Sequence, residues 1–449
     1  MLFALFLALF LAGGLVGCDL TNDGVNPPRG ELNFPIAIEL SPDAQFLFVA
    51  NSNFDLRFNA GTVQSFRVND MVSAMRAGQT GPALQSVEVA PTDVLESEVL
   101  LGSHMSGLAV DPEGQRLYLP VRSDANLTFI DLNGGNMVCG GDNSRRCSDR
   151  FRAGNLSVAS QRDISLPNDP VGLEVRDLSD FAPGAVGVLI MTAHRTGELS
   201  LFTDQMPGAG TDSVPTLLHV ASDLGDNVTT LSFDDRTATA WLPTATFDNA
   251  AAPIGRAALA IDPMGLRSFS FSVGPVRATD VNDGDDIRDV AFRTLPDGSN
   301  RAYVLSRSPE GVLVVDLDRS LPGQLFVRNI LPIGIGPSRL EIASFLVGRP
   351  GEEEERTLLF ASCFNTRDVH IIDTDREELV GIIRRLSGPF ELVVDPSRNL
   401  VFVADFRSST VRVVDLQPLF DCLTGSDAVS CEPVEIGSLG APRPVGELL

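Results

Sequence analysis

The sequence predicts an all-β fold built from seven copies of one strand-and-turn unit. The clearest copy runs from Gly388 to Leu416 and reads as three short strands rich in Val, Ile, Leu and Phe. Its first strand ends at the turn Asp395-Pro396, and apolar runs separated by such turn residues are typical of antiparallel strands. A unit of this kind cannot bury both of its faces alone, so it requires copies of itself beside it.

Six further copies follow from the same turn and the same β-rich middle segment. Ser106 to Leu132 is the clearest of them, because it keeps the turn Asp111-Pro112 and ends in Ile130-Asp131-Leu132. The other five are Pro35 to Val68, Pro170 to Asp204, Asn227 to Asp262, Asp286 to Asp318 and Pro337 to Thr374.

The segments between the copies each supply a candidate fourth strand. Seven units of four strands suit a closed ring, which leaves no free sheet edge to promote aggregation. For the closure itself we expect Glu31 to Phe34 to add no more than a short strand beside the C-terminal segment. The expected fourth strands are Leu84–Ala90, Leu156–Leu166, Leu217–Ala221, Leu266–Val273, Gln324–Leu331, Glu378–Leu386 and Val434–Leu439.

The last copy carries a resemblance to a known family. Its pattern of Pro-x-x-Leu-x-Val-Asp-Pro, Leu-Val-Phe-Val-Ala-Asp and Ser-Thr-Val-x-Val-Val-Asp-Leu resembles the YVTN-type, lactonase-like β-propeller repeat. The resemblance extends from Phe34 to the C-terminal end and implies a seven-bladed β-propeller of four-stranded antiparallel blades. It implies little about activity, because propellers support binding proteins, hydrolases and oxidoreductases alike.

The N-terminal segment indicates export. Met1 to Val16 is almost wholly apolar and too short to span a membrane, which fits a secretory signal peptide. Leu15-Val16-Gly17-Cys18 resembles the lipobox of bacterial lipoproteins, which implies cleavage after residue 17 and acylation of Cys18 by chains such as palmitate. No Lys or Arg precedes the apolar run, so Met1 need not be the true start.

We therefore expect three parts: a signal peptide over residues 1–17, a lipidated Cys18 with a polar tether over 18–33, and the propeller over 34–449. Two acyl chains anchor a protein stably where one is marginal. The expected location is the bacterial cell envelope, with the propeller in the periplasm or at the cell surface, and the membrane is a partner through the anchor.

The charge balance restricts the possible partners. The chain has 34 basic and 59 acidic residues, a formal net charge of −25. Such a surface repels nucleic acid, so we expect no nucleic-acid partner and instead a protein or carbohydrate at the envelope. The charge serves solubility, or it attracts cationic ligands or divalent ions.

Cysteine usage agrees with an oxidising compartment. Beside Cys18 there are two closely spaced pairs, Cys139 with Cys147 and Cys422 with Cys431, and we expect a disulfide in each. Neither pair has the spacing of a zinc site. Cys363 follows an apolar strand and is expected to be a lone, partly buried thiol without a histidine base.

Loops on one face of the disc are the expected ligand site, because function in such folds is carried by loops. The loop Asn51 to Ala60 is unusually aromatic, Phe247 to Arg256 widens the fourth blade, and Met71 to Gln79 could form a short helix. The expected ligand-face residues are Asn51, Phe54, Asp55, Arg57, Phe58, Asn59, Phe247 and Asp248.

The densest group of oxygen ligands is the acidic segment before the fifth blade. Alternating Asp and Asn around a Gly suit calcium, although the Glu that ends an EF-hand loop is missing, and a solvated acidic loop is the alternative. Calcium is the one cofactor that we consider. Its candidate ligands are Asp280, Asn282, Asp283, Asp285, Asp286 and Asp289.

The histidines show no zinc-binding or catalytic spacing. His104 and His194 both lie near strand ends that can face the central channel, so together they could act as base or metal ligands. Ordinary histidines at strand ends are the alternative. The sequence thus favours a non-catalytic binding or scaffold module, and the second possibility is a lactonase-like, metal-dependent hydrolase with its site at the mouth of the channel.

Overall fold

The computed structural model describes most of the chain from Gly24 to Arg443. Every strand below lies within its described residues, which are 24–79, 86–140, 145–154, 166–181, 183–205, 213–245, 254–259, 286–321, 324–348, 351, 353–425 and 431–443.

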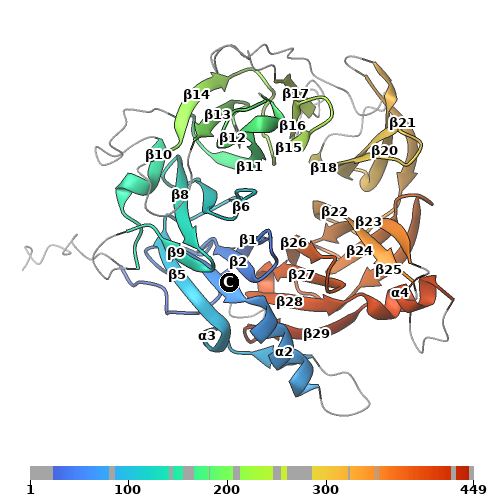
Figure 1. Cartoon of the computed structure of the whole chain (residues 1–449), viewed down its shortest axis with the longest axis horizontal. Helices are drawn as coiled ribbons and strands as arrows, with labels where there is room; N and C mark the ends of the chain where they lie inside the picture. The colour runs from blue at the N-terminus through green and yellow to red at the C-terminus, as the bar shows by residue number, and fades with distance from the viewer. Residues whose placement is uncertain are drawn as a thin grey trace, which may run out of the picture.

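Seven antiparallel sheets stand around a central axis, which confirms the predicted seven-bladed β-propeller (Figure 1). Blade one contains β1 (Pro35–Leu40), β2 (Phe46–Asn51), β3 (Gly61–Arg67) and β5 (Leu95–Leu101). Blade two contains β6 (Ala109–Val110), β7 (Arg116–Val121), β8 (Asn126–Asn133) and β10 (Arg152–Gly154), and β9 (Asn136–Val138) also pairs with β8. Blade three contains β11 (Pro170–Asp177), β12 (Val188–His194), β13 (Leu199–Asp204) and β14 (Thr216–Ala221).

The second half of the ring repeats this order. Blade four has three strands in the described part of the chain, β15 (Ser232–Asp234), β16 (Thr239–Pro243) and β17 (Ile254–Ala258). Blade five contains β18 (Ile287–Thr294), β19 (Asn300–Arg307), β20 (Glu310–Leu321) and β21 (Gln324–Leu331). Blade six contains β22 (Pro337–Val347), β23 (Glu354–Cys363), β24 (Asp368–Asp373) and β25 (Glu378–Ile383). Blade seven contains β26 (Pro389–Asp395), β27 (Leu400–Asp405), β28 (Thr410–Asp415), β29 (Val434–Leu439) and, as a fifth strand, β4 (Val87–Val89).

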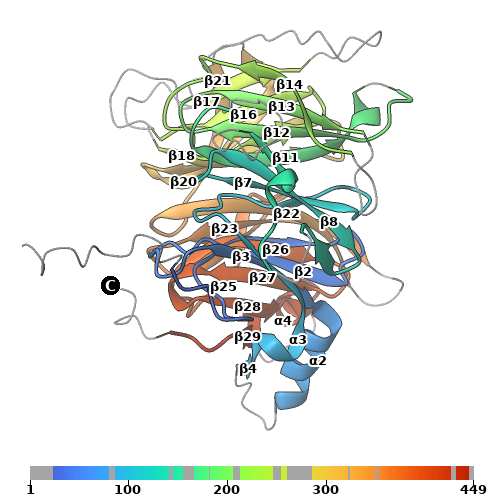
Figure 2. The same ribbon diagram turned by 90° about the vertical axis from the view of Figure 1, so that its left-hand side faces the viewer.

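The hydrophobic core lies between neighbouring blades. The second strand of each blade is largely buried because both of its faces contact apolar side chains, as Phe48 and Ala50 on one face of β2 and Leu47 and Val49 on the other show. Leu47 and Val49 pack in one cluster with Phe402 and Ala404 of β27, so blade one and blade seven share a core. Seen edge-on, the blades stack into a thick disc with the short helices on its rim (Figure 2).

The ring closes by a route that the sequence did not indicate. The predicted fourth strand of blade one, Leu84–Ala90, instead supplies β4, which pairs in parallel with β29 of blade seven. Leu95–Leu101, predicted to be a loop, forms the outer strand β5 of blade one. The cause is helix α2 (Val68–Gly78), whose buried Met71 and Met75 pack in the core shared by the two blades and carry the chain across.

Most other predicted fourth strands are confirmed, including Val434–Leu439 with the bounds expected. In blade two, β10 precedes the predicted segment Leu156–Leu166, and Leu266–Val273 of blade four lies outside the described residues. Glu31 to Phe34 forms no strand, although Arg443 contacts Glu31 and Asn33 there. The remaining helices are α3 (Pro91–Val94), α4 (Gln417–Leu423) and three single 3₁₀ turns, Asp149–Phe151, Leu178–Asp180 and Phe406–Ser408. No helix in the described residues is long and apolar enough to cross a membrane.

Candidate functional site in the central channel

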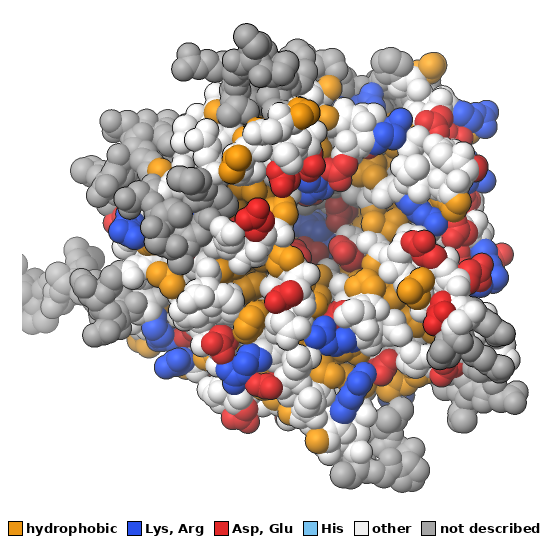
Figure 3. Space-filling view, in the orientation of Figure 1, with side chains coloured by type: hydrophobic (Ala, Val, Ile, Leu, Met, Phe, Trp, Pro, Cys, Tyr) orange, Lys and Arg blue, Asp and Glu red, His pale blue; other side chains and the backbone are white. Residues whose placement is uncertain are grey.

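The central channel contains a cavity of about 550 Å³ lined by residues from the innermost strands of all seven blades. The space-filling view shows the hollow at the centre of the disc, with acidic and basic side chains in its depth (Figure 3). Seven acidic residues line it: Asp234 and Asp235 of blade four, and one from each of five other blades, namely Glu39, Glu174, Asp289, Glu341 and Glu391. We call these five residues the channel carboxylates.

A repeated irregularity in the innermost strands places these side chains. Five of the seven innermost strands break register with their neighbour between their first and third residues. Asp289, Arg339 and Glu391 are the third residues of their innermost strands. Glu39, Glu174 and Glu341 are the fifth residues of theirs. Because successive side chains of a strand alternate between its two sides, third and fifth residues point to the same side, here into the channel.

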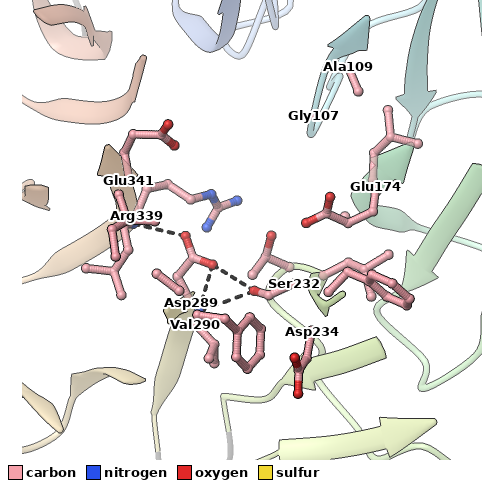
Figure 4. A pocket seen from close by; sticks show the side chains of 18 of the residues that line it. Gly107, Ala109, Glu174, Ser232, Asp234, Asp289, Val290, Arg339 and Glu341 are labelled. Carbon is pink, nitrogen blue, oxygen red and sulfur yellow. Dashed lines mark hydrogen bonds between the residues drawn. The ribbon is translucent and has the colours of Figure 1, made fainter. Parts of the chain in front are cut away.

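Arg339 occupies the centre of this arrangement. Its Nε donates to Glu391 Oε2 at 3.2 Å, and its guanidinium lies 5.3 Å from the centre of the Phe390 ring. Figure 4 shows Glu174 and Glu341 directed into the cavity from opposite walls, with Arg339 reaching between them. Burial raises the pKa of Glu391 to about 7, although the adjacent Arg339 opposes the rise.

Asp289 and Glu174 are held by fixed donors. Asp289 accepts hydrogen bonds from the Ser232 hydroxyl at 3.0 Å and from the Leu340 backbone N–H at 3.0 Å. Glu174 accepts from Arg176 at 2.7 Å, and the same guanidinium donates to Asp235 at 2.6 Å. Burial nevertheless raises the pKa of both Asp289 and Glu174.

Glu39 and Glu341 have no cationic partner among the described residues. Burial, with the negative charge of Glu391 as the next cause, raises the pKa of Glu39 to about 8. Burial and then the carboxylates of Glu39 and Glu391 raise the pKa of Glu341 well above its ordinary value. A carboxyl that loses hydration and faces like charges favours its protonated form. Of the channel carboxylates, Glu39 and Glu341 are therefore the two whose ionised form a bound cation would stabilise most.

The channel carboxylates do not converge on a point. Calcium requires several oxygen atoms at about 2.3–2.6 Å from the ion, which brings those atoms close to one another. In the described part of the chain, the group of three or more side chains that approaches closely enough to hold one metal ion lies elsewhere, in blade six. The spread of the channel carboxylates suits a larger organic cation better than a bare metal ion.

A second cavity of about 200 Å³ adjoins the first and has the opposite charge. Arg339 and Ser106 line both cavities, so the two share a wall. The wall of the second cavity has five arginines from four blades and no acidic residue, and we call these the mouth arginines: Arg122, Arg195, Arg288, Arg307 and Arg339.

The mouth arginines are incompletely neutralised. Arg122 pairs with Asp169, and Arg288 pairs with Asp286 at 2.6 Å. The hydrogen bonds of the Arg307 guanidinium go only to the Pro337 carbonyl oxygen, and burial followed by the positive charge of Arg288 lowers its pKa. Nε of Arg288 is also buried without a hydrogen-bond partner. Such a group is ready to bind an anion.

Aromatic side chains lie beside this mouth. Phe406 packs against Phe34, Phe54, Phe364 and Phe390 at ring separations of 5.0 to 6.1 Å. Phe54 keeps 58% of its surface exposed although its ring contacts two others. The loop that joins β2 to β3 therefore lies on the same face as the segment that enters β1.

The other predicted ligand-face residues have mixed positions. Asn51 is buried in β2 and donates to Thr62 and Gln64, so it stabilises the loop. Asp55 pairs with Arg57 at 3.4 Å at the surface, Phe58 is half-buried, and the Asn59 backbone N–H donates to the Val25 carbonyl. Neither cavity is lined by these residues, and Phe247 and Asp248 lie outside the described part of the chain.

The two candidate histidines do not line either cavity. His104 lies beside Phe54 with ring centres 6.1 Å apart. His194 ends β12, is fully buried and lies 2.8 Å from the Ser200 hydroxyl. Burial lowers the pKa of His194 to about 4, so its ring is neutral at physiological pH.

The predicted calcium segment is only partly described. Asp280, Asn282, Asp283 and Asp285 lie outside the described residues, as does Cys18. Asp286 pairs with Arg288, and Asp289 lies within β18, which begins earlier than the sequence suggested, and faces the channel. Both predicted disulfides, Cys139–Cys147 and Cys422–Cys431, are present.

Sequence reasoning missed the channel carboxylates, although a signal was available. The pattern Pro-x-x-x-Glu begins three of the seven repeats, at Pro35–Glu39, Pro170–Glu174 and Pro337–Glu341. A charged residue at a fixed place in an otherwise apolar strand indicates a polar channel when the strand is the innermost of a ring. It also missed Asp368 and His370 beside Cys363, because strand pairing rather than sequence adjacency brings them together.

Comparison with known proteins adds to the description of the fold. No family model and no curated protein matches the sequence. Hydrazine synthase of Kuenenia stuttgartiensis is similar in structure, with a TM-score of 0.51 and 14% identity over 89% of this chain and 99% of that chain.

Two further solved structures have lower scores. A functionally unknown protein from Desulfotomaculum acetoxidans has a TM-score of 0.48 and 14% identity over 80% of this chain and 88% of that one. A proposed 6-phosphogluconolactonase from Bacteroides uniformis has a TM-score of 0.43 and 15% identity over 77% and 83%. At these identities the likeness is one of fold and says nothing of activity.

Proposed function

We propose that the protein is an exported, lipid-anchored β-propeller of the bacterial cell envelope that binds a small zwitterionic ligand in its central channel without catalysing a reaction. One observation carries the binding role. Among the described residues, Glu39 and Glu341 have no cationic partner and line one cavity, and Arg307 has no carboxylate hydrogen-bond partner and lines the cavity beside it. A cation beside the two carboxyls would favour their ionised form, and an anion would neutralise Arg307, so a molecule that carries both groups gains free energy on binding.

The ligand class follows from the two walls. An ammonium group fits between the channel carboxylates, and a carboxylate or phosphate fits among the mouth arginines. Molecules of the amino-acid or short-peptide class carry both groups a few bonds apart. A neutral carbohydrate offers neither countercharge, so this site favours a charged ligand over the carbohydrate partner that the composition had allowed.

The proposed location at the cell envelope is argued from the sequence and from the disulfides. Both small loops are closed by bridges, which form and persist in oxidising compartments. The lipid anchor is inferred from the resemblance of the sequence around Cys18 to a lipobox. Metabolic labelling with a fatty acid should mark the native chain and leave Cys18→Ser unlabelled, and equal labelling of both would overturn the anchor.

Calorimetric titration tests the binding role. We expect amino acids and dipeptides to bind, and their amide-blocked or acetyl-blocked analogues, each lacking one charge, to bind at least tenfold more weakly. Glu341→Gln should weaken binding of the amine-bearing ligands, Arg307→Gln should weaken binding of the anion, and Arg384→Gln, a half-exposed arginine elsewhere, is the control. Equal affinity for blocked and free ligands would exclude the proposed mode.

The pH dependence gives a second test. Binding of a cation requires the ionised form of Glu39, whose pKa is raised to about 8 by burial. The affinity for amines should therefore rise from pH 6 to about pH 8 and fall at higher pH, where the ligand's own ammonium group loses its proton. Affinity that is constant across this range would show that Glu39 does not face the ligand.

A metal-dependent hydrolase at the channel mouth is the second candidate. The observation in its favour is Glu391, whose pKa of about 7 beside Arg339 suits a general acid or base. A lactone-hydrolysis assay separates the two candidates. Turnover that is lost in Glu391→Gln would favour the enzyme, and binding without turnover favours the module.

A further inference from the structure

Three side chains with metal-binding atoms meet in blade six, between its second and third strands. Cys363 is the last residue of β23, and Asp368 and His370 are the first and third residues of β24. The pairing of these strands sets Cys363 opposite Asp368 and Ala361 opposite His370. Side chains two residues apart share one side of a sheet, so all three project from the same side of blade six.

The donor atoms are close enough to share one ion. The Cys363 sulfur, an Asp368 carboxylate oxygen and a His370 ring nitrogen all lie within 4.8 Å of one another. His370 Nε2 is 3.5 Å from Asp368 Oδ1. Zinc bound tetrahedrally at about 2.0–2.3 Å from nitrogen, oxygen and sulfur places its ligand atoms roughly this far apart.

The surroundings favour a bound ion over an ordinary core position. Cys363 is fully buried and His370 is 9% exposed, so two polar groups have been removed from water. In the described part of the chain, Nδ1 of His370 has no hydrogen-bond partner. The Cys363 sulfur has a weak contact at 3.8 Å to the Ala361 carbonyl and further weak interactions with the Gly334 backbone and the Thr366 side chain. Buried polar atoms normally have hydrogen-bond partners, so a buried ring nitrogen left without one calls for an explanation.

The backbone of the neighbouring loop approaches the cluster closely. A Cβ atom placed on Gly334, in the loop between β21 and β22, would lie 2.1 Å from the Thr366 hydroxyl and 2.8 Å from Asp368 Oδ1. Only glycine allows this loop to approach so closely. The exposed Thr366 donates to Asp368 at 2.7 Å, which orients the carboxylate as outer-shell partners do in metal sites.

A catalytic cysteine is the other role that such a group suggests. Burial, and then the charge of Asp368, raises the pKa of the Cys363 thiol to about 12. A thiol of that kind supplies almost no thiolate for nucleophilic attack at neutral pH. A metal ion removes this obstacle for ligation, because it displaces the thiol proton to solvent as the metal–sulfur bond forms.

From this geometry we propose that Cys363, Asp368 and His370 form a site for a zinc-class divalent metal ion, with a fourth position open to water on the side of Thr366. The set of one sulfur, one nitrogen and one oxygen ligand excludes magnesium and calcium, which prefer oxygen alone. The ion would fasten the end of β23 to the start of β24 across their turn, beside the loop that precedes β22. The proposal is independent of the ligand proposed for the channel.

Metal titration of the full-length, detergent-solubilised protein tests this site. After treatment with a chelator, we expect one zinc ion per chain to bind and one cobalt ion to replace it. Cobalt should produce the near-ultraviolet charge-transfer band of a thiolate ligand. Because this spectrum needs no variant, it tests the site in the unmodified chain.

Variants then assign the ligands. Cys363→Ser and His370→Gln should each weaken zinc binding by more than the roughly 10–100-fold that loss of an outer-shell partner costs. His104→Gln, a histidine outside the cluster, is the matched control and should bind zinc as before. Circular dichroism establishes that each variant is folded. No stoichiometric zinc, a cobalt spectrum without the thiolate band, or unchanged affinity in both ligand variants would overturn the proposal.

Discussion

Two groups of charged side chains in the interior of this protein, one fully buried and one half-buried, differ in how completely they are neutralised. Between blades two and three, Arg116 is buried with Asp131 and Asp204. Its guanidinium also donates to the Ser213 carbonyl and lies 4.8 Å from the Phe129 ring centre, and the Tyr118 hydroxyl donates to Asp204. In the channel, Glu39 and Glu341 have no such partners.

This difference distinguishes charges that stabilise the fold from charges that are available to a ligand. A buried charge whose hydrogen bonds are all made contributes to a unique packed state and offers nothing to a ligand. A buried charge without a partner lowers stability, and such groups cluster at functional sites. The lack of partners for these carboxyls, rather than their burial alone, is therefore the basis of the binding site proposed for the channel.

The largest expected effect comes from breaking the neutralised group. Arg116→Ala leaves two buried carboxylates without their cation, and we expect a loss of about 3–5 kcal/mol in the free energy of unfolding. Arg76→Ala, which removes a surface pair with Asp415, is the control and should cost less than about 1 kcal/mol. Urea denaturation measures both. Equal losses would contradict the comparison.

Removal of a charge in the channel should instead increase the free energy of unfolding. The pKa of Glu39 is raised in the folded protein to about 8, so the folded state binds more protons than the unfolded state between about pH 4.5 and 8. Its contribution to stability therefore falls as pH rises through this range and is constant above it. Glu39→Gln removes the charge and should stabilise the protein by about 1–3 kcal/mol at pH 9, with no gain near pH 4.

Thermal unfolding of Glu39→Gln and the native chain across pH 4 to 9 measures this difference. Glu354→Gln, whose side chain is 71% exposed, serves as the control and should show no such trend. Destabilisation by Glu39→Gln at pH 9 would mean that the carboxylate has a cationic partner after all.

The smallest effect is expected at Asp289, which lies between the two extremes because neutral donors hold it. Ser232→Ala removes one donor at 3.0 Å and should cost about 1 kcal/mol. It should also raise the pKa of Asp289 further, since the lost hydrogen bond favours the ionised form. Nuclear magnetic resonance titration of the carboxyl carbon would detect the rise, and an unchanged pKa would show that the backbone N–H groups alone fix Asp289.

The repeated strands could be predicted because each copy carries its own turn residues and apolar pattern, as Gly388 to Leu416 does. The placement of β4 could not, since it depends on the direction in which α2 leaves blade one. The mouth arginines could not be predicted from the sequence either. Arg122 follows β7 of blade two and Arg307 ends β19 of blade five, and only the closed ring brings them to one cavity.

The closure by β4 has a consequence for biosynthesis. Val87–Val89 is synthesised long before its partner Val434–Leu439. Until that partner has been made, the edge of β4 remains uncovered, and contacts between distant segments form slowly. A chain that is interrupted before β29 keeps an open strand edge at this seam, which favours aggregation.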